Sequence, residues 1–322
     1  MSKQTVSRTV KSNAASVIST DEAARAGVLS REEVKAITAR RRSSSGLLTG
    51  LIYVFLTIMA LFALFPLYYV AQASLAGAQN LYTTDLHLLP VHPTLDNYVY
   101  AFTQEPILYW FANTAFVCGL GTAIGLIFSM TGAYALSRFR MRGRELSLNL
   151  LLTIQAFPGL LAITAYYYLL QYLNLLNTAP LLGLALIYAA GNIVFGTWNI
   201  KGYFDTLPVE LEQAAMVDGA SHFQAFIRVV LPLAAPALAT TALLTFVSGW
   251  NEFPLANYVI SGNPQGTDLT FILGLFQLQG NFRTPWGYFA ATSIIISVPL
   301  MIVFLYAQRY FQSGLTIGSV KG

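Results

Sequence analysis

The sequence contains six apolar stretches that are each long enough to cross a lipid bilayer. They span residues 47–75, 110–137, 146–173, 179–200, 233–260 and 286–308, and Glu252 is the one formal charge inside them. A bilayer core about 30 Å thick takes about 20 helical residues, and a charge at mid-membrane costs several kcal/mol. Runs of this length lack the alternation of a membrane strand. The sequence therefore predicts an all-α membrane protein with six transmembrane helices.

The positions of the basic residues predict the orientation. Of the 18 Lys and Arg residues, 17 lie in residues 1–46, in 138–145, in 201–232 or after residue 308, and only Arg283 lies on the opposite side. Because cytoplasmic loops carry the excess of Lys and Arg, we expect both termini to be cytoplasmic in a multi-pass membrane protein. The net charge of +4 is then explained by topology and contact with membrane lipid, without nucleic acid.

Residues 1–46 are expected to form a cytoplasmic extension in front of a six-span domain over 47–322, with residues 1–18 disordered. Ser30 and Glu33 have capping-box spacing, which predicts a short helix that runs into Arg40, Arg41 and Arg42 at the membrane face. The basic end is expected to bind anionic lipid, and a dedicated regulatory domain is the alternative.

The sequence contains no constellation of residues typical of catalysis. The glycine-rich stretch at 119–125 lacks the lysine of a phosphate loop and lies within a span, so it is expected to serve helix packing. His87, His92 and His222 lack metal-ligand spacing, and Cys118 lies in an apolar run. The spans also lack the paired acids or arginine series of a proton-coupled carrier or voltage sensor. We expect a protein that is not an enzyme, binds no metal or cofactor itself, and is energised by another chain.

Polar and helix-breaking residues within three spans are candidate pathway or gate residues. Pro158 and Gly159 lie near the middle of the third span, Asn192 near the middle of the fourth, and Glu252 toward the outer end of the fifth. Such residues are tolerated where they face protein or a water-filled cavity. The alternatives are kinked helices packed on small residues and, for Glu252, a carboxylate at the membrane interface.

The cytoplasmic connection 201–232 is polar and rich in helix formers. Pro208 suits a first helical turn and Gly219 a helix stop, while Ser221 and Gln224 have capping-box spacing for a second helix. The apolar positions of that second helix recur at helical spacing: Phe223, Phe226, Ile227 and Val230. Two short helices joined at Gly219, too polar for lipid, are a natural docking element for a cytoplasmic partner.

The spacing within this connection resembles the "EAA" loop of the membrane subunits of binding-protein-dependent ABC importers. That loop reads E-A-A, three residues, G, nine residues, then I-x-L-P. The matching residues here are Gln213, Ala214, Ala215, Gly219, Val229, Leu231 and Pro232. Glutamine thus replaces the first acid, and valine replaces the isoleucine. The stretch "NEFP" and the tail 307–322 further resemble the smaller membrane subunit of maltose/maltodextrin importers, over about residues 47–322.

The resemblance implies a MetI-like ABC importer permease fold in which residues 208–219 form a coupling helix in a cleft of the ATPase. The implied ATPase-coupling residues are Glu210, Glu212, Gln213, Ala214, Ala215, Asp218, Gly219, Leu231 and Pro232. The three acids among them lie close to position 213, where the motif acid is missing. The resemblance also implies that loop 261–285 faces an external sugar-binding protein and that the tail 313–322 touches the ATPase dimer.

The function implied by the resemblance is that of a permease subunit of an ATP-driven sugar importer in the bacterial inner membrane, for maltose or maltodextrins. It would pair with a second permease subunit, an ABC ATPase dimer that binds ATP and Mg, and an extracytoplasmic sugar-binding protein. A permease for trehalose, another disaccharide or glycerol phosphate is the alternative. A stand-alone channel or secondary carrier would leave the 208–232 connection without a purpose, and a membrane-embedded enzyme lacks candidate residues.

Overall fold

The computed structural model describes residues 31–77, 89–90, 92–260, 266–279 and 286–318. Within these ranges the chain is helical and forms no strand, and its one isolated bridge joins Ala76 and Pro93. The α-helices are, in chain order, α3 (Arg31–Leu75), α4 (Asp96–Gln104), α5 (Ile107–Arg138), α6 (Arg144–Ala156), α7 (Ile163–Tyr172), α8 (Leu175–Thr178), α9 (Pro180–Phe204), α10 (Glu210–Val217), α11 (His222–Ala225), α12 (Leu231–Leu233), α13 (Ala235–Trp250), α14 (Pro254–Ile260), α15 (Phe271–Gln277) and α16 (Trp286–Gly318). Three short helical turns lie between them: η2 (Gly159–Ala162), η3 (Phe226–Val230) and η4 (Gly266–Asp268).

The chain divides into two compact units, residues 1–69 and 70–322. The division falls within α3 and not at the expected boundary after residue 46. In the first unit, α3 begins directly after the predicted cap at Ser30 and continues without a break. The helix predicted to run into Arg40, Arg41 and Arg42 is therefore the beginning of a longer helix that continues into the first apolar stretch. An interior glycine costs a helix only about 1 kcal/mol, so Gly46 and Gly50 do not end it. The stretch predicted to be disordered, 1–18, lies outside the described residues.

Four helices are long and apolar enough to cross a membrane unbroken. They are Leu48–Leu75, Ile107–Arg138, Pro180–Phe204 and Trp286–Gln308. Two further candidates are bent pairs of helices: Arg144–Ala156 meets Gly159–Tyr172 at 88°, and His222–Leu233 meets Ala235–Trp250 at 75°. Counting each bent pair as one span gives the predicted six. The predicted third span, 146–173, is the first bent pair, whereas the predicted fifth span, 233–260, comprises α13 and α14.

Prolines account for both bends. Phe157 has an extended ψ of 127°, as expected for a residue before proline, and Pro158 separates α6 from η2 and α7. Pro232 and Pro236 each lie in the first turn of a new helix, α12 and α13, with Ala234 outside both. Pro254 then begins α14. The helix-breaking role expected of Pro158 is confirmed.

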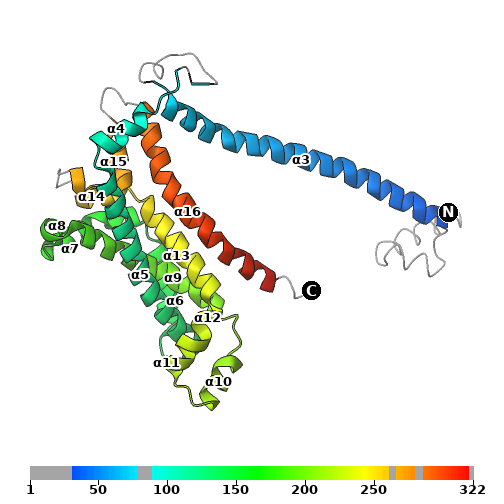
Figure 1. Cartoon of the computed structure of the whole chain (residues 1–322). Helices are drawn as coiled ribbons and strands as arrows, with labels where there is room; N and C mark the ends of the chain where they lie inside the picture. Colours follow the sequence, from blue (N-terminus) through cyan, green and yellow to red (C-terminus); the bar gives the residue numbers. More distant parts are fainter. Residues whose placement is uncertain (1–30, 78–88, 91, 261–265, 280–285, 319–322) are drawn as a thin grey trace. The chain divides into compact units, whose positions relative to one another are not determined.

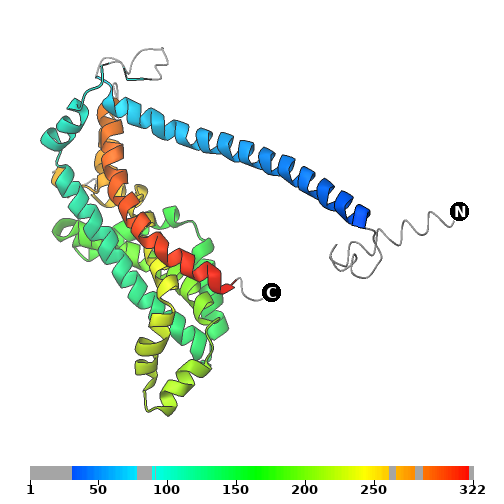
Figure 2. The same ribbon diagram turned by 45° about the vertical axis from the view of Figure 1, so that its right-hand side comes forward.

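The second unit is organised around α5 and α9, which form its most extensive helix pair. In Figures 1 and 2, α4 and α15 lie at the Ile107 end of α5, and α10–α12 lie at its Arg138 end. Small residues permit the close approach, because a Cβ added to Gly125 would lie 2.7 Å from the Cβ of Asn192. A Cβ on Gly121 would lie 3.1 Å from the carbonyl oxygen of Ala185. The packing role predicted for the glycines in 119–125 holds for these two.

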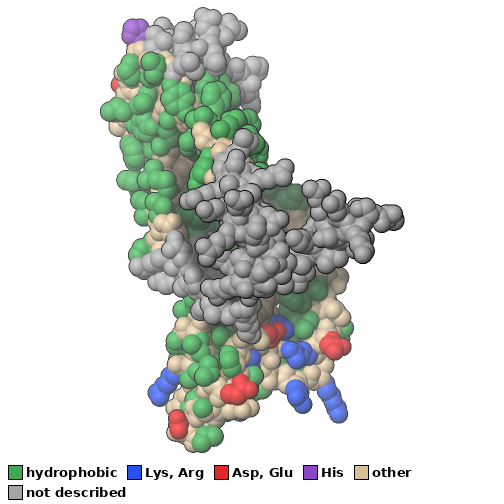
Figure 3. Space-filling model, turned by 90° about the vertical axis from the view of Figure 1, so that its right-hand side faces the viewer, with side chains coloured by type: hydrophobic (Ala, Val, Ile, Leu, Met, Phe, Trp, Pro, Cys, Tyr) green, Lys and Arg blue, Asp and Glu red, His purple; other side chains and the backbone are tan. Residues whose placement is uncertain are grey.

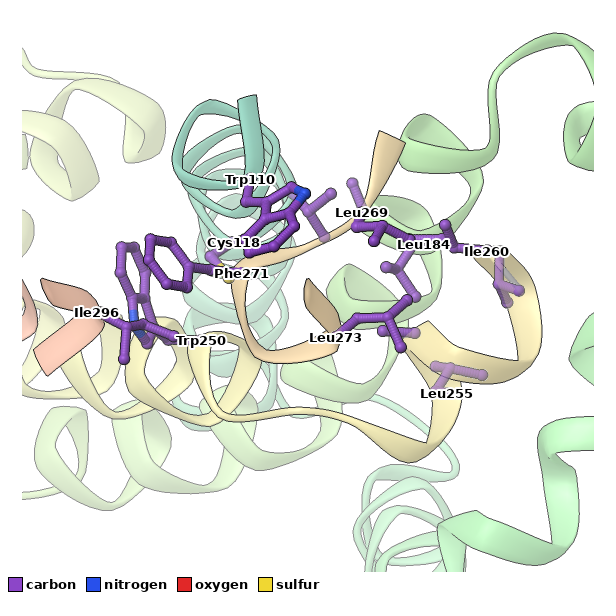
Figure 4. Close-up of a cluster of buried hydrophobic side chains, with 14 of the residues drawn as sticks. Trp110, Cys118, Leu184, Trp250, Leu255, Ile260, Leu269, Phe271, Leu273 and Ile296 are labelled. Atoms are coloured by element: carbon purple, nitrogen blue, oxygen red, sulfur yellow. The ribbon is translucent and has the colours of Figure 1, made fainter. Parts of the chain in front are cut away.

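A buried apolar cluster fills the Ile107 end of this unit (Figure 4). Trp110 and Phe271 meet edge to face with ring centroids 6.0 Å apart. The indole N–H of Trp110 donates to the carbonyl oxygen of Gly266 at 2.6 Å, and the N–H of Phe271 donates to Oγ1 of Thr114 at 2.7 Å. The described part of the predicted external loop 261–285 is therefore held against the first turns of α5.

Helix α4 lies in the connection between α3 and α5. The buried side-chain amide of Asn97 donates to the carbonyl oxygens of Ser74 and Ala76, at 2.8 and 2.9 Å. The ring of Tyr100 stacks on Tyr288 of α16, with centroids 4.1 Å apart. At the other end of the chain α16 extends to Gly318, and the last four residues lie outside the described range.

Candidate coupling element and pathway cavity

The first half of the predicted docking element is α10, which spans Glu210–Val217, a shorter helix than the predicted 208–219. It ends as the sequence predicts, because Gly219 has a φ of +90°, which suits glycine. The N–H of Gly219 bonds to the carbonyl of Met216 and the N–H of Ala220 to the carbonyl of Ala215, both at 3.0 Å. This pair of bonds is a Schellman motif, which satisfies carbonyls that a helix end leaves free.

The second half of the docking element begins at Ser221 with the predicted capping box, but it does not continue as the predicted regular α-helix. The Gln224 N–H donates to the hydroxyl of Ser221, and the Ser221 N–H donates to the side chain of Gln224, so the capping box is confirmed. After α11, residues 226–230 form a π-helical turn. Phe226 and Val230 are buried while Ile227 is exposed. The predicted apolar stripe is therefore split, because i→i+5 bonding rotates the residues away from 3.6-residue spacing.

A buried ion pair connects α10 to the end of α5. The Arg138 Nε–H donates to Oε1 of Glu212 at 2.5 Å, and the hydroxyl of Tyr134 donates to Oε2 at 2.9 Å. The Arg138 and Glu212 side chains are only 8% and 6% exposed. Arg138 also donates to the carbonyl oxygen of Leu207, at 3.2 Å. Glu212 therefore points into the protein, and its carboxylate is occupied by α5.

Aromatic packing surrounds this ion pair. The ring of Tyr134 contacts Phe139, Phe204 and Phe226 at centroid distances of 5.8, 6.3 and 4.5 Å. Phe204, Phe226 and Val230 belong to the same buried cluster. Burial among these rings protects the ion pair from water and strengthens it. Sequence reasoning missed Arg138 and Tyr134, because it treated the arginines of 138–145 only as markers of topology.

A second charged group ties the end of α9 to α5. Lys201 donates to Oδ2 of Asp205 at 2.5 Å, and the hydroxyl of Ser137 donates to Oδ1 at 2.6 Å. Partial burial raises the pKa of Asp205, but these hydrogen bonds and the positive charges of Lys201 and Arg144 outweigh that effect and lower its pKa below the usual value. Figure 3 shows the visible Lys and Arg side chains, together with most of the visible Asp and Glu side chains, at the end of the unit that carries α10 and α11.

The opposite side of α10 is open to solvent. Gln213 and Ala214 are exposed, Ala215 is half-buried, and Asp218 and Gly219 are exposed beyond the helix end. Glu210 is also exposed, whereas Leu231 is half-buried and Pro232 is exposed farther along the element. Exposed apolar side chains lie beside them, including Val217 at 88% and Phe223 at 68%. Of the three acids that lie close to position 213, Glu210 and Asp218 are exposed and Glu212 is buried.

Three of the four candidate pathway residues line one cavity of about 650 Å³. Gly159 enters it from η2, Asn192 from α9 and Glu252 from the turn between α13 and α14. Pro158 breaks the helix next to Gly159 but is not among the lining residues. The cavity therefore lies beside the break in the third predicted span.

Glu252 lines this cavity, and its carboxylate also bonds to neighbouring parts of the lining. It accepts hydrogen bonds from the hydroxyl of Tyr188 at 2.6 Å and from the N–H groups of Leu255 and Ala256 at 2.7 and 3.0 Å. The last two bonds cap the start of α14, and the first joins this turn to α9. Tyr188 was missed, although it precedes Asn192 by one helical turn and so shares its face of α9.

Among the described residues, no group of three or more His, Cys, Asp or Glu could hold a metal ion. Cys118 is buried, and His222 is exposed on α11. A solvent-exposed element braced on a transmembrane helix, together with a cavity between bent helices, is typical of a membrane transport component. This chain belongs to the family of binding-protein-dependent transport system inner membrane components, whose model matches residues 121–317. It is a non-catalytic, multi-pass membrane subunit, and the resemblance carried by the EAA spacing is confirmed.

Known relatives cover most of the chain. The galactooligosaccharides transport system permease protein GanQ of Bacillus subtilis (strain 168) is 35% identical over 277 residues, which are 84% of this chain and 94% of GanQ. The maltose/maltodextrin transport system permease protein MalG of Vibrio vulnificus (strain YJ016) is 39% identical over 222 residues, 67% of this chain and 73% of MalG. A chain from the crystal structure of a bacterial ABC transporter for the acidic polysaccharide alginate aligns with a TM-score of 0.71 and 26% identity, covering 83% of this chain and 98% of that chain.

Proposed function

We propose that this chain is a permease subunit of an ABC importer for oligosaccharides, with maltose and maltodextrins as the first candidates. The relatives named for galactooligosaccharides and for maltose/maltodextrin support the sugar class. GanQ matches over more of the chain and MalG matches at higher identity, so galactooligosaccharides are the second candidate.

The proposed assembly contains a second permease subunit, an ABC ATPase dimer that binds ATP and Mg, and an extracytoplasmic sugar-binding protein. Residues 48–69 of α3 form a continuous apolar helix, which suits contact with lipid or with the second permease subunit. The segment over 266–279, held on α5, is proposed to face the binding protein.

The observation that carries the proposal is the two-sided construction of α10. Its solvent-exposed side presents Gln213, Ala214 and the apolar side chain of Val217. Its inner side is joined to α5 through Glu212 and Arg138. A helix built in this way can bind a cytoplasmic partner and pass the partner's movement to a transmembrane helix.

In the proposed mechanism, closure of the ATPase dimer on ATP pushes α10, and α10 pushes α5. The buried cluster around Tyr134, Phe204 and Phe226 moves with them as one packed body, because packed interiors transmit strain and do not deform smoothly. Rotation of the spans then exposes the cavity between α7, α9 and α13 alternately to the two sides of the membrane. The chain biases a two-state equilibrium and performs no bond chemistry.

Site-specific cross-linking tests the docking surface. Val217 and Tyr172 are both 88% exposed, but one ends α10 and the other ends α7. Cys118 is the single native cysteine and is buried, so a benzophenone attached to Val217→Cys or Tyr172→Cys labels one chosen position. We expect ultraviolet light to join the Val217→Cys complex to the ATPase and the Tyr172→Cys control to leave the ATPase free. Equal labelling at both positions contradicts docking through α10.

Reconstitution tests the energy source and the sugar. Uptake into proteoliposomes should require the ATPase, ATP and the loaded binding protein, with maltodextrins and galactooligosaccharides compared side by side. Uptake by this chain without any ATPase would establish a channel or secondary carrier in place of an ABC permease.

A further inference from the structure

The connection between α5 and α6 carries a cluster of arginines. Helix α5 ends at Arg138 and α6 begins at Arg144, and Arg140 and Arg142 lie in the short stretch between them. Arg138 is buried in its ion pair with Glu212, whereas Arg140 and Arg142 are exposed. Within the described ranges, the arginines at 140, 142 and 144 form no ion pair. Residues 139–144, called the α5–α6 corner below, therefore carry three positive charges available to another partner.

The acids around this corner do not supply that partner. Asp205 is near enough for the charge of Arg144 to lower its pKa, but its carboxylate oxygens already accept from Lys201 and Ser137. The buried Nε–H of Arg144 donates to no group in the described part of the chain. Glu145 is exposed and forms no ion pair with any described residue. Because a buried donor without an acceptor is unfavourable, the corner suits an anion from outside the chain.

The short connection keeps the corner at the membrane surface. Ile107–Arg138 and the bent pair that begins at Arg144 are both candidate membrane spans, so the chain leaves the membrane and returns within residues 139–143. A stretch of this length that goes out and back rises at most about 9 Å above the helix ends. The headgroup layer on each side of a bilayer is about 5–8 Å deep. In Figures 1 and 2, α10 and α11 instead lie at the tip of the unit, so the corner lies nearer to lipid than the docking element does.

Apolar side chains alternate with the arginines along the corner. Phe139 and Met141 are each 42% exposed, and Leu146 in the next turn is 73% exposed. A free anion would use only the charges and would leave these apolar groups in water. A phospholipid uses both, because arginine keeps its charged head at the phosphate while apolar groups contact the acyl boundary. Helix α6 also begins at Gly143 without a side-chain cap, and a helix N-terminus attracts phosphate.

We propose that the α5–α6 corner binds the phosphate of an anionic phospholipid in the leaflet on the α10 side of the membrane. The guanidinium groups of Arg140 and Arg142 bind the phosphodiester oxygens, since the planar arginine fork matches phosphate. Phe139 and Met141 contact the glycerol and the upper acyl chains. This lipid site goes beyond the proposed function, and it depends on the membrane topology and not on the transported sugar.

Binding is measured on the full-length chain in a nonionic detergent, by fluorescence anisotropy of a labelled dioctanoyl phosphatidylglycerol. One arginine near a lipid surface changes the affinity about fivefold, so Arg140→Gln and Arg142→Gln should each raise the Kd about fivefold and the double variant about 25-fold. Arg228→Gln is the matched control, because Arg228 is an exposed arginine of η3 that forms no ion pair with described residues. Its Kd should stay within about twofold of wild type.

Other probes separate a lipid from a free anion. Met141→Ser should raise the Kd for dioctanoyl phosphatidylglycerol about fourfold, which corresponds to one buried methylene. Dioctanoyl phosphatidylcholine, which has no net charge, should bind at least about tenfold more weakly, as should inorganic phosphate used as a competitor. Phosphatidylglycerol should raise the unfolding temperature of wild type and Arg228→Gln but not of the double variant. Without lipid, the three proteins should unfold at the same temperature.

Four results would overturn the lipid site. Equal Kd values for Arg142→Gln and Arg228→Gln would show that diffuse charge explains the binding. Inorganic phosphate that competes as tightly as phosphatidylglycerol would identify a free-anion site. A lower lipid-free unfolding temperature in the double variant would show that the arginines hold the fold. Loss of the ATPase from the purified complex, with phosphatidylglycerol binding unchanged, would assign the corner to protein docking. None of these measurements depends on uptake, so the proposed function is tested separately.

Discussion

The ion pair between Glu212 and Arg138 makes a sharp prediction about Glu212→Ala. The substitution removes two hydrogen bonds of the carboxylate, from Arg138 at 2.5 Å and from Tyr134 at 2.9 Å. At about 1.5–3 kcal/mol for each bond to a charged group, the loss is about 3–6 kcal/mol. Removing one partner of a buried ion pair in other proteins lowers the free energy of unfolding by about 3–5 kcal/mol, which agrees with this range. We therefore expect Glu212→Ala to destabilise the packing of α10 on α5 by about 3–5 kcal/mol.

Related variants set the order of effects. Glu212→Gln keeps the shape and can still accept from Arg138 while donating to the hydroxyl of Tyr134, so its cost should be about half that of alanine. Replacing the whole pair in the double variant Arg138→Met/Glu212→Leu leaves no unpaired buried charge and should recover most of the stability. Glu210→Ala is the matched control, because Glu210 is an exposed acid on the same helix and should change stability by less than about 1 kcal/mol.

The assay is thermal unfolding of the purified complex in detergent, followed by size-exclusion fluorescence, with sugar uptake measured in parallel. Glu212→Ala should have the lowest unfolding temperature, followed by Glu212→Gln, with the double variant and Glu210→Ala near wild type. The double variant should also transport poorly, because the directional link between α10 and α5 is lost. Equal stability of Glu212→Ala and Glu210→Ala would refute the inference that Glu212 is buried and paired.

Three further predictions concern other positions. In Gly219→Pro, the proline cannot adopt the φ of +90° found at this position. The variant should therefore insert into the membrane normally but hydrolyse ATP without coupled uptake. Normal uptake coupled to sugar-stimulated ATPase activity would count against the coupling role. Gly274→Ala would place a Cβ 2.5 Å from Cε3 of Trp110 and should cost about 1–3 kcal/mol, measured as a lower unfolding temperature than that of Gly202→Ala. Because the pKa of Asp205 is lowered in the folded protein, its contribution to stability is present above its unfolded pKa near 3.8 and is lost as the pH falls through the lower folded value. The stability difference between wild type and Asp205→Asn should therefore be constant above about pH 5 and shrink in stronger acid, and a difference that grows in acid would reverse the assigned sign.

Local features of this protein were predictable from its sequence because the interactions that cause them join near neighbours. The capping box of Ser221, the helix stop at Gly219 and the break at Pro158 each involve residues within about five positions of one another. The six apolar stretches follow from the cost of polar groups in lipid, which acts on each segment separately. The spacing that identifies the EAA loop is also local. The cytoplasmic location of both termini stays a prediction.

Where side chains point depends on contacts between distant parts of the chain. Glu212 turns inward because Arg138, 74 positions away, lies behind it, and Glu252 meets Tyr188 across 64 positions. The segment around Phe271 folds back on Thr114 across 157 positions. The sequence by itself determined which segments are apolar enough to cross a membrane and where glycine, proline and capping residues interrupt a helix, since local geometry and lipid solvation decide both. Only the tertiary structure decided which acid of α10 is buried and which residues share a cavity, because burial and pairing arise when helices pack.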